Sequence, residues 1–167
     1  AAAHAAMRGD DGRADWERAG RAVALAGALA ATAALWLLAG AAFDWQVAWV
    51  AALLFGVGRK WAALGTDVLS DAPAVAAQLW AAALAVVTCR LLSRRSAWSL
   101  PAAAGVGLCA GGGYLLREEA LLVGPIAAAL WLALPGGRRG GWGLRLGAVA
   151  AMALAALACV LPYASAI

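Results

Sequence analysis

The sequence has little charge. Asp, Glu, Lys and Arg make up 13% of its 167 residues, whereas 65% are hydrophobic. Soluble domains are about a quarter charged and about half apolar, and the mean hydropathy of this chain is +0.82. This composition excludes an ordinary soluble domain and indicates a protein of the membrane.

Metal-ligating side chains are also scarce. The chain has one histidine, His4, and three cysteines, Cys89, Cys109 and Cys159, without a Cys-x-x-Cys pair. A zinc site or a disulfide framework needs clustered ligands. We therefore predict no metal and no cofactor, and we expect the cysteines to be small buried side chains in helices.

No signal-peptide pattern stands at the front, where an initiator Met is also missing, and the last residues belong to an apolar run. We expect the chain to be a piece of a longer polypeptide. The net charge is +4, but the basic residues form short clusters between apolar runs. This placement is typical of loops at an anionic membrane surface and argues against a nucleic-acid partner.

Long uncharged stretches dominate the rest of the chain. At about 1.5 Å per residue, residues 22–43 are long enough to cross a hydrocarbon core of about 30 Å. The pattern predicts an all-α, polytopic membrane bundle of about six transmembrane helices within residues 22–167, preceded by a polar, amphipathic segment, residues 1–21. The six apolar runs are 22–43, 45–58 (short for a span), 72–89, 100–116, 120–134 and 146–167.

The loop charges predict the orientation of this bundle. If the loops alternate sides, the N-terminal segment and the connections 59–71 and 117–119 share one face. The two faces then carry nearly equal numbers of Lys and Arg. When the N-terminal segment is set aside as part of a longer translocated loop, its face keeps three basic residues and the other face has six. We therefore predict that the loops at 90–95 and 138–145 are cytoplasmic, in the cell membrane of a bacterium.

The stretch Gly105–Pro125 holds three charges, Arg117, Glu118 and Glu119, directly between two apolar runs. One interpretation is that interfacial charges simply end two helices. The other is that Arg117 holds a lipid-linked phosphate with its planar donor fork. The adjacent glutamates would then contact sugar hydroxyls or position the arginine.

A second polar connection belongs to the same predicted face. Arg59, Lys60 and Asp71 lie in it, and we predict that all three contribute to substrate binding at the non-cytoplasmic side. For Asp71 an alternative remains, because with Ser70 it can cap the following helix and suit its dipole.

Glycines gather inside the fourth apolar run, including Gly107 and Gly111. Phosphate-binding glycine loops lie between a strand and a helix in water, so that function is excluded. Small residues that let two helices approach closely are one explanation. A locally unwound helix that lines a cavity is the other.

Several motifs occur in a characteristic order along the chain: Glu17–Arg21, Asp44–Phe55, Val68–Asp71, the basic turn at 90–95, Gly105–Pro125 and Val160–Tyr163. This order resembles the GT-C superfamily of membrane glycosyltransferases, in particular the dolichyl-phosphate-mannose protein mannosyltransferase-like group. The resemblance spans roughly residues 15–165. Glu118 stands where the family usually has proline, so the glutamate of the family's Arg-Pro-Glu motif corresponds to Glu119.

The resemblance implies transfer of a sugar from a polyprenyl-phosphate donor to a protein, lipid or glycan acceptor at the non-cytoplasmic face. It also implies that the catalytic residue is an aspartate in an outer loop upstream of residue 1, since Asp10 and Asp11 lie too near the first helix. Two other classes stay open: a multi-pass transporter or flippase, and a non-catalytic scaffold. Internal repeats would favour the transporter, but the first three runs do not resemble the last three.

Overall fold

The computed structural model describes residues 16–58, 71–134 and 141–165, and helices make up nearly all of these ranges. Each predicted apolar run contains or overlaps one α-helix, so the predicted all-α class is confirmed. The described elements are α2 (Trp16–Ala42), α3 (Trp45–Val57), α5 (Asp71–Ser93), α6 (Ser99–Tyr114), the 3₁₀ turn η1 (Glu118–Leu122), α7 (Val123–Ala133) and α8 (Trp142–Ala164).

Three of the described helices are long and apolar enough to cross a membrane. They are Arg18–Ala42 within α2, α5 and α8, with mean hydropathies of 2.1, 1.8 and 2.2. Helices α3, α6 and α7 have 13, 16 and 11 residues. At 1.5 Å per residue they reach only about 17–24 Å, less than a hydrocarbon core of about 30 Å.

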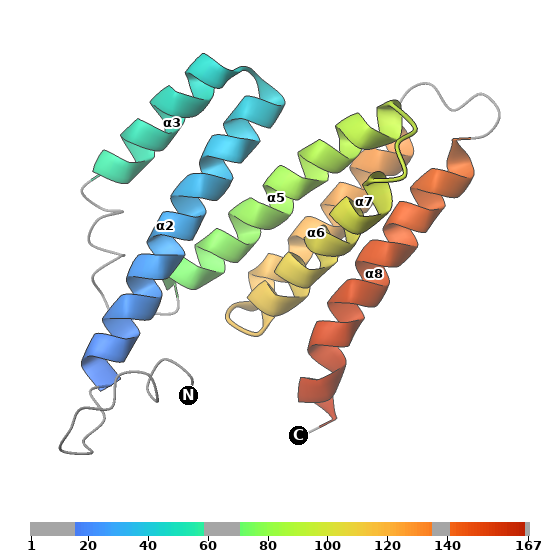
Figure 1. Cartoon of the computed structure of the whole chain (residues 1–167). Coiled ribbons are helices and arrows are strands. Elements are labelled where there is room, and N and C mark those ends of the chain that lie inside the picture. The colour runs from blue at the N-terminus through green and yellow to red at the C-terminus, as the bar shows by residue number, and fades with distance from the viewer. Residues whose placement is uncertain (1–15, 59–70, 135–140, 166–167) are drawn as a thin grey trace.

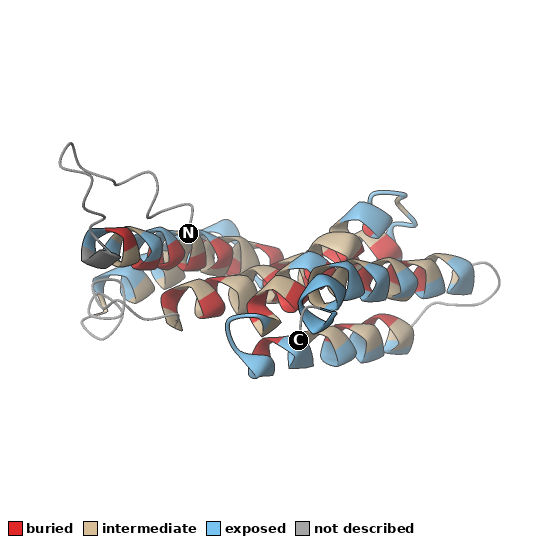
Figure 2. Ribbon diagram, turned by 90° about the horizontal axis from the view of Figure 1, so that it is seen from below, coloured by how far each residue is buried: buried red, intermediate tan, exposed pale blue. Residues whose placement is uncertain are grey.

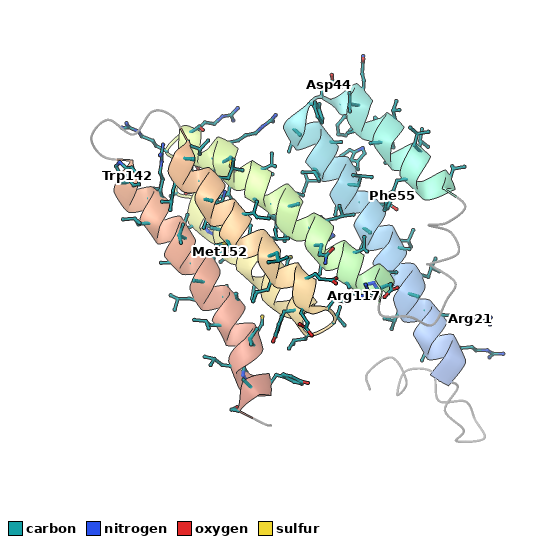
Figure 3. All side chains as sticks on the ribbon, turned by 180° about the vertical axis from the view of Figure 1, so that it is seen from behind. Arg21, Asp44, Phe55, Arg117, Trp142 and Met152 are labelled. Carbon is teal, nitrogen blue, oxygen red and sulfur yellow. The ribbon has the colours of Figure 1, made fainter. Side chains whose placement is uncertain are left out.

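The helices lie side by side, and successive helices along the chain run in opposite directions (Figure 1). Contacts run in the order α3, α2, α5, α6 and α8, and α7 contacts α5, α6 and α8. Asp44 and Trp142 therefore lie at one end of the bundle, and Arg21 and Arg117 lie toward the other (Figure 3). The end of α6 and the start of α5 are thus brought to the same end.

The interior is built mainly from alanine, and the buried residues form stripes where neighbouring helices face one another (Figure 2). The largest fully buried side chain is Trp131. Its Nε1 donates a hydrogen bond of 3.1 Å to the carbonyl oxygen of Ala85, which ties α7 to α5. A buried indole N–H needs such a partner, because leaving it unpaired would be costly.

Two glycines of α6 explain its close packing on α8. A Cβ on Gly107 would overlap the carbonyl oxygen of Met152, and one on Gly111 would lie 2.8 Å from that of Ala156. Helix α6 is continuous through both positions. The prediction of close helix approach is therefore confirmed, and the alternative of a locally unwound helix is wrong.

Two helix starts differ from the predicted ones. Helix α2 begins at Trp16, so the predicted lead-in and the first span form one helix. Helix α8 begins at Trp142 and includes Arg145, which we predicted to lie in a loop. Arg145 is only 8% exposed, and its Nη1 donates to the carbonyl oxygen of Leu134 at 2.8 Å. The arginine is tolerated inside because it satisfies a carbonyl that the end of α7 leaves free.

Candidate functional site

The first residue of α5, Asp71, is positioned by close contact between α5 and α2. A Cβ on Gly27 of α2 would lie 2.7 Å from the backbone nitrogen of Pro73. Only glycine allows this approach of the two backbones. The proline stands in the first turn of α5, where its missing N–H leaves no hydrogen bond unmade.

The turn after α6 brings Arg117 toward this helix start. Arg117 has an extended backbone (φ −152°, ψ 131°), and its N–H donates to the carbonyl oxygen of Gly113 at 2.8 Å. A Cβ on Gly113 would lie 2.8 Å from Ala120 and 3.1 Å from Ala77 of α5. The turn is thus held against α5 by small residues on both sides.

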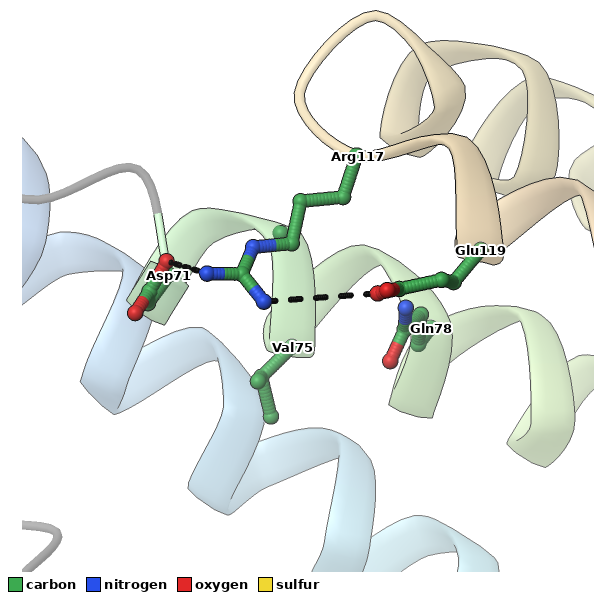
Figure 4. A pocket seen from close by; sticks show the side chains of 6 residues that line it. Asp71, Val75, Gln78, Arg117 and Glu119 are labelled. Carbon is green, nitrogen blue, oxygen red and sulfur yellow. Dashed lines mark hydrogen bonds and ion pairs between the residues drawn. The ribbon is translucent and has the colours of Figure 1, made fainter.

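The arginine joins two carboxylates that come from different elements (Figure 4). Its Nη2 donates a 2.5 Å hydrogen bond to Oδ1 of Asp71, which is 46 residues away in the sequence. Its Nη1 lies 4.0 Å from Oε2 of Glu119. The side chains of Arg117 and Asp71 are 48% and 27% exposed, so water screens the pair and its contribution to stability is at most about 1 kcal/mol.

Two hollows adjoin the arginine. A cavity of about 150 Å³ has polar and apolar walls from α5 and the turn. Its lining residues are Asp71, Ala74, Val75, Gln78, Arg117 and Glu119. A wider, more open hollow of about 440 Å³ is lined by Leu116, Arg117, Glu118 and Glu119. Arg117 and Glu119 therefore belong to both hollows.

The structure brings together three of the six predicted site residues, Asp71, Arg117 and Glu119. Glu118 lines the wider hollow but not the cavity. The remaining two, Arg59 and Lys60, lie outside the described residues. At Asp71 the carboxylate accepts a hydrogen bond from Arg117, while its place in the first turn of α5 also suits the helix dipole.

Gln78 is a cavity-lining residue that the sequence reasoning missed. It lies two helical turns after Asp71, so both side chains project from one face of α5. The seven-residue spacing from Asp71 was a usable signal once α5 was predicted to start near that residue.

The chemistry of the hollows follows from their charges. Among the described lining residues there is one arginine against three carboxylates, Asp71, Glu118 and Glu119. Carboxylates accept hydrogen bonds from hydroxyl groups, and a guanidinium donates to phosphate. Within the described ranges, no three His, Cys, Asp or Glu side chains are grouped as a metal site requires.

A comparison with protein families connects this geometry with known proteins. The model of the dolichyl-phosphate-mannose-protein mannosyltransferase family matches residues 14–165. The chain belongs to this family. Membership in the mannosyltransferase family implies glycosyltransferase activity, a lipid-linked sugar donor and a membrane setting. It lends no support to the transporter or flippase alternative. Searches among curated proteins and among solved structures found no match.

Proposed function

We propose that this chain forms the donor-binding part of a glycosyltransferase that takes its sugar from a polyprenyl-phosphate carrier. The acceptor is a protein, lipid or glycan at the non-cytoplasmic face of a bacterial cell membrane. The observation that carries the proposal is the cluster of Arg117, Asp71 and Glu119 around one cavity in a member of the mannosyltransferase family.

Each charged group has a role that suits its chemistry. Arg117 binds the donor phosphate through its planar fork of N–H donors. Asp71, Glu118 and Glu119 accept hydrogen bonds from sugar hydroxyls and hold the arginine in place. Because the carboxylates outnumber the arginine, the proposal includes Arg59 and Lys60 as additional cations that balance the phosphate charge.

The proposed reaction is a direct displacement. An acceptor hydroxyl oxygen attacks the anomeric carbon, and the bond between that carbon and the phosphate oxygen breaks. Polyprenyl phosphate leaves with the electron pair, and the hydroxyl proton passes to a general base. By family resemblance, we assign the base to an aspartate outside this chain, N-terminal to it.

The orientation is supported by the arginines at the end opposite Arg117. Arg90, Arg94 and Arg95 are exposed there, and Arg145 lies in the first turn of α8. Basic residues at a membrane surface favour the cytoplasmic side. This would leave the Arg117 cluster facing the non-cytoplasmic side.

The test of this function is sugar transfer by the full-length protein in liposomes, with a labelled polyprenyl-phosphate sugar as donor. We expect Arg117→Ala to reduce kcat/KM by roughly 100-fold or more, because a charge-assisted pair of hydrogen bonds to phosphate is lost. Arg117→Lys should restore only part of the activity, since an ammonium lacks the planar fork.

Arg90→Ala is the matched control, because Arg90 is an exposed arginine at the other end of α5. It should leave kcat/KM unchanged. Equal activity of the Arg117→Ala protein and the parent would remove Arg117 from the site and leave it as an interfacial charge.

A further inference from the structure

Gln78 is an unusual side chain for its surroundings. The chain has two glutamines and no asparagine, and this glutamine lies inside the apolar helix α5. The hydroxyls of Thr32 and Thr88 bond to carbonyls of their own helices, those of Ala28 and Leu84. Gln78 has no hydrogen bond within the described part of the chain. A polar group in a membrane helix is costly unless it faces a polar partner, so such residues mark functional sites.

The partner of this amide must enter the cavity beside Arg117. Gln78 lines that cavity together with Asp71, Arg117 and Glu119 (Figure 4). Gln78 lies seven residues after Asp71 in α5, a distance of about 10 Å along the helix axis. Along α5, Gln78 therefore lies deeper in the bundle than Asp71, the carboxylate that accepts a hydrogen bond from Arg117.

The depth of Gln78 indicates which part of a lipid-linked sugar its side chain contacts. The hydrocarbon tail of such a donor stays in the membrane, its sugar points to water, and its phosphate lies between the two. A group deeper than the contact between Arg117 and Asp71 thus approaches the phosphate from the tail side. The carboxamide of glutamine offers two N–H donors without adding charge, which suits a phosphate in a site already crowded with carboxylates.

We propose that Gln78 is a second phosphate-binding residue, whose side-chain N–H₂ donates to a phosphoryl oxygen from the membrane side while Arg117 binds it from the charged end. This inference rests on the proposed function, because it takes the ligand to be a polyprenyl phosphate. It differs from a sugar contact in one measurable respect: it holds for the lipid phosphate without any sugar.

The experiment measures binding of two ligands to the full-length protein in nanodiscs: the sugar-bearing donor and sugar-free polyprenyl phosphate. Gln78→Ala should weaken both about tenfold and by the same factor, as expected for one hydrogen bond to a charged group. The thermal midpoint should not fall, since alanine is apolar and a good helix former. Gln46→Ala, which removes the other glutamine at an exposed position of α3, should change neither affinity.

Gln78→Glu keeps the size of the side chain but replaces the donor by a negative charge in the cavity that Glu119 also lines. It should weaken the binding of sugar-free polyprenyl phosphate more than Gln78→Ala does. Unchanged affinities in Gln78→Ala, or a loss for the sugar-bearing donor alone, would overturn the assignment. If the Gln78→Glu protein binds sugar-free polyprenyl phosphate as tightly as the Gln78→Ala protein, or more tightly, the assignment is overturned as well.

The result is separable from the proposed function as a whole. If the parent protein binds polyprenyl phosphate through Gln78 yet transfers no sugar, the transferase proposal fails and the phosphate contact stands. If the parent transfers sugar and the Gln78→Ala protein binds both ligands normally, the transferase proposal stands and the phosphate contact of Gln78 is wrong.

Discussion

Arg117 has both terminal nitrogens directed at carboxylates. Nη2 donates to Asp71, and Nη1 faces Glu119 at a longer distance. A phosphate that binds this guanidinium must therefore displace a carboxylate or use the side that remains open to the wider hollow. Asp71 thus prepares the arginine for an anion and also competes with that anion for it.

The ion pair between Arg117 and Asp71 is partly exposed, and this predicts a small effect on stability. Asp71→Asn should change the free energy of unfolding by less than about 1 kcal/mol, because water screens the pair. Thermal unfolding of the purified protein in detergent measures this, with Arg90→Ala as a charge-removal control. A loss of several kcal/mol would mean that the pair holds the fold together and is not kept for a ligand.

Sequence reasoning found the charged residues of the site and missed the neutral one. Asp71, Arg117 and Glu119 stand out because only 13% of the residues in this chain are charged. Gln78 does not, since one amide leaves the hydropathy of a helix nearly unchanged. Arg145 was predicted to be in a loop because its role depends on the carbonyl oxygen of Leu134, a tertiary contact with no local signal.

At the scale of the elements, small residues set where the site lies. Gly27 fixes α5 against α2, and Gly113 fixes the turn against α5. Gly107 performs the same task between α6 and α8, farther from the charged end. The helices approach so closely that backbone atoms of one element contact the other, which favours dispersion contacts and excludes larger side chains.

Gly107→Ala tests this close packing. The new methyl group would overlap a backbone carbonyl, which cannot rotate away, so we expect a loss of about 1–3 kcal/mol in unfolding free energy. Gly112→Ala, in the same helix, is the matched control. A Cβ there meets nothing within 4 Å, so this change should be neutral or stabilise by up to about 1 kcal/mol.

Chemical or thermal unfolding of both variants gives the comparison. If the two glycines respond alike, helix propensity rather than helix approach governs α6, and the packing explanation is wrong.

The sequence predicted which segments are helical better than where they end. Residues 120–134 form one apolar run, yet its first residues belong to the 3₁₀ turn η1, and α7 starts only at Val123. Leu121 and Leu122 have the same hydropathy in either geometry. Ala120 of the turn is buried beside Gly113 of α6, a tertiary contact that no periodicity in the run can reveal.

At the scale of the whole molecule, the two ends of the bundle differ in charge. At the end with Arg117, one arginine and three carboxylates surround two hollows, and Arg18 and Arg21 lie near the start of α2. The opposite end has three exposed arginines, Arg90 in the last turn of α5 and Arg94 and Arg95 just after it. The only described acid at that end is Asp44, which is engaged at the start of α3, where its Oδ1 accepts from the N–H of Val47 at 2.8 Å. This asymmetry gives the molecule a direction across a membrane.

Cysteine labelling determines that direction. In a background with Cys89, Cys109 and Cys159 replaced by alanine, Glu118→Cys and Arg94→Cys place one exposed thiol at each end of the bundle. An impermeant thiol reagent added to intact cells should label the Glu118→Cys protein. It should label the Arg94→Cys protein only after the membrane is permeabilised, because basic loops stay in the cytoplasm.

The cysteine-free parent is the background control, and it should remain unlabelled in both conditions. Labelling of both variants in intact cells would contradict the arrangement of the two positions at opposite ends of a spanning bundle. Labelling of only the Arg94→Cys protein in intact cells would mean that the molecule has the opposite orientation in the membrane. The charged cluster would then face the cytoplasm, so sugar transfer at the non-cytoplasmic side could not use it, although the arrangement of Arg117, Asp71 and Glu119 would be the same.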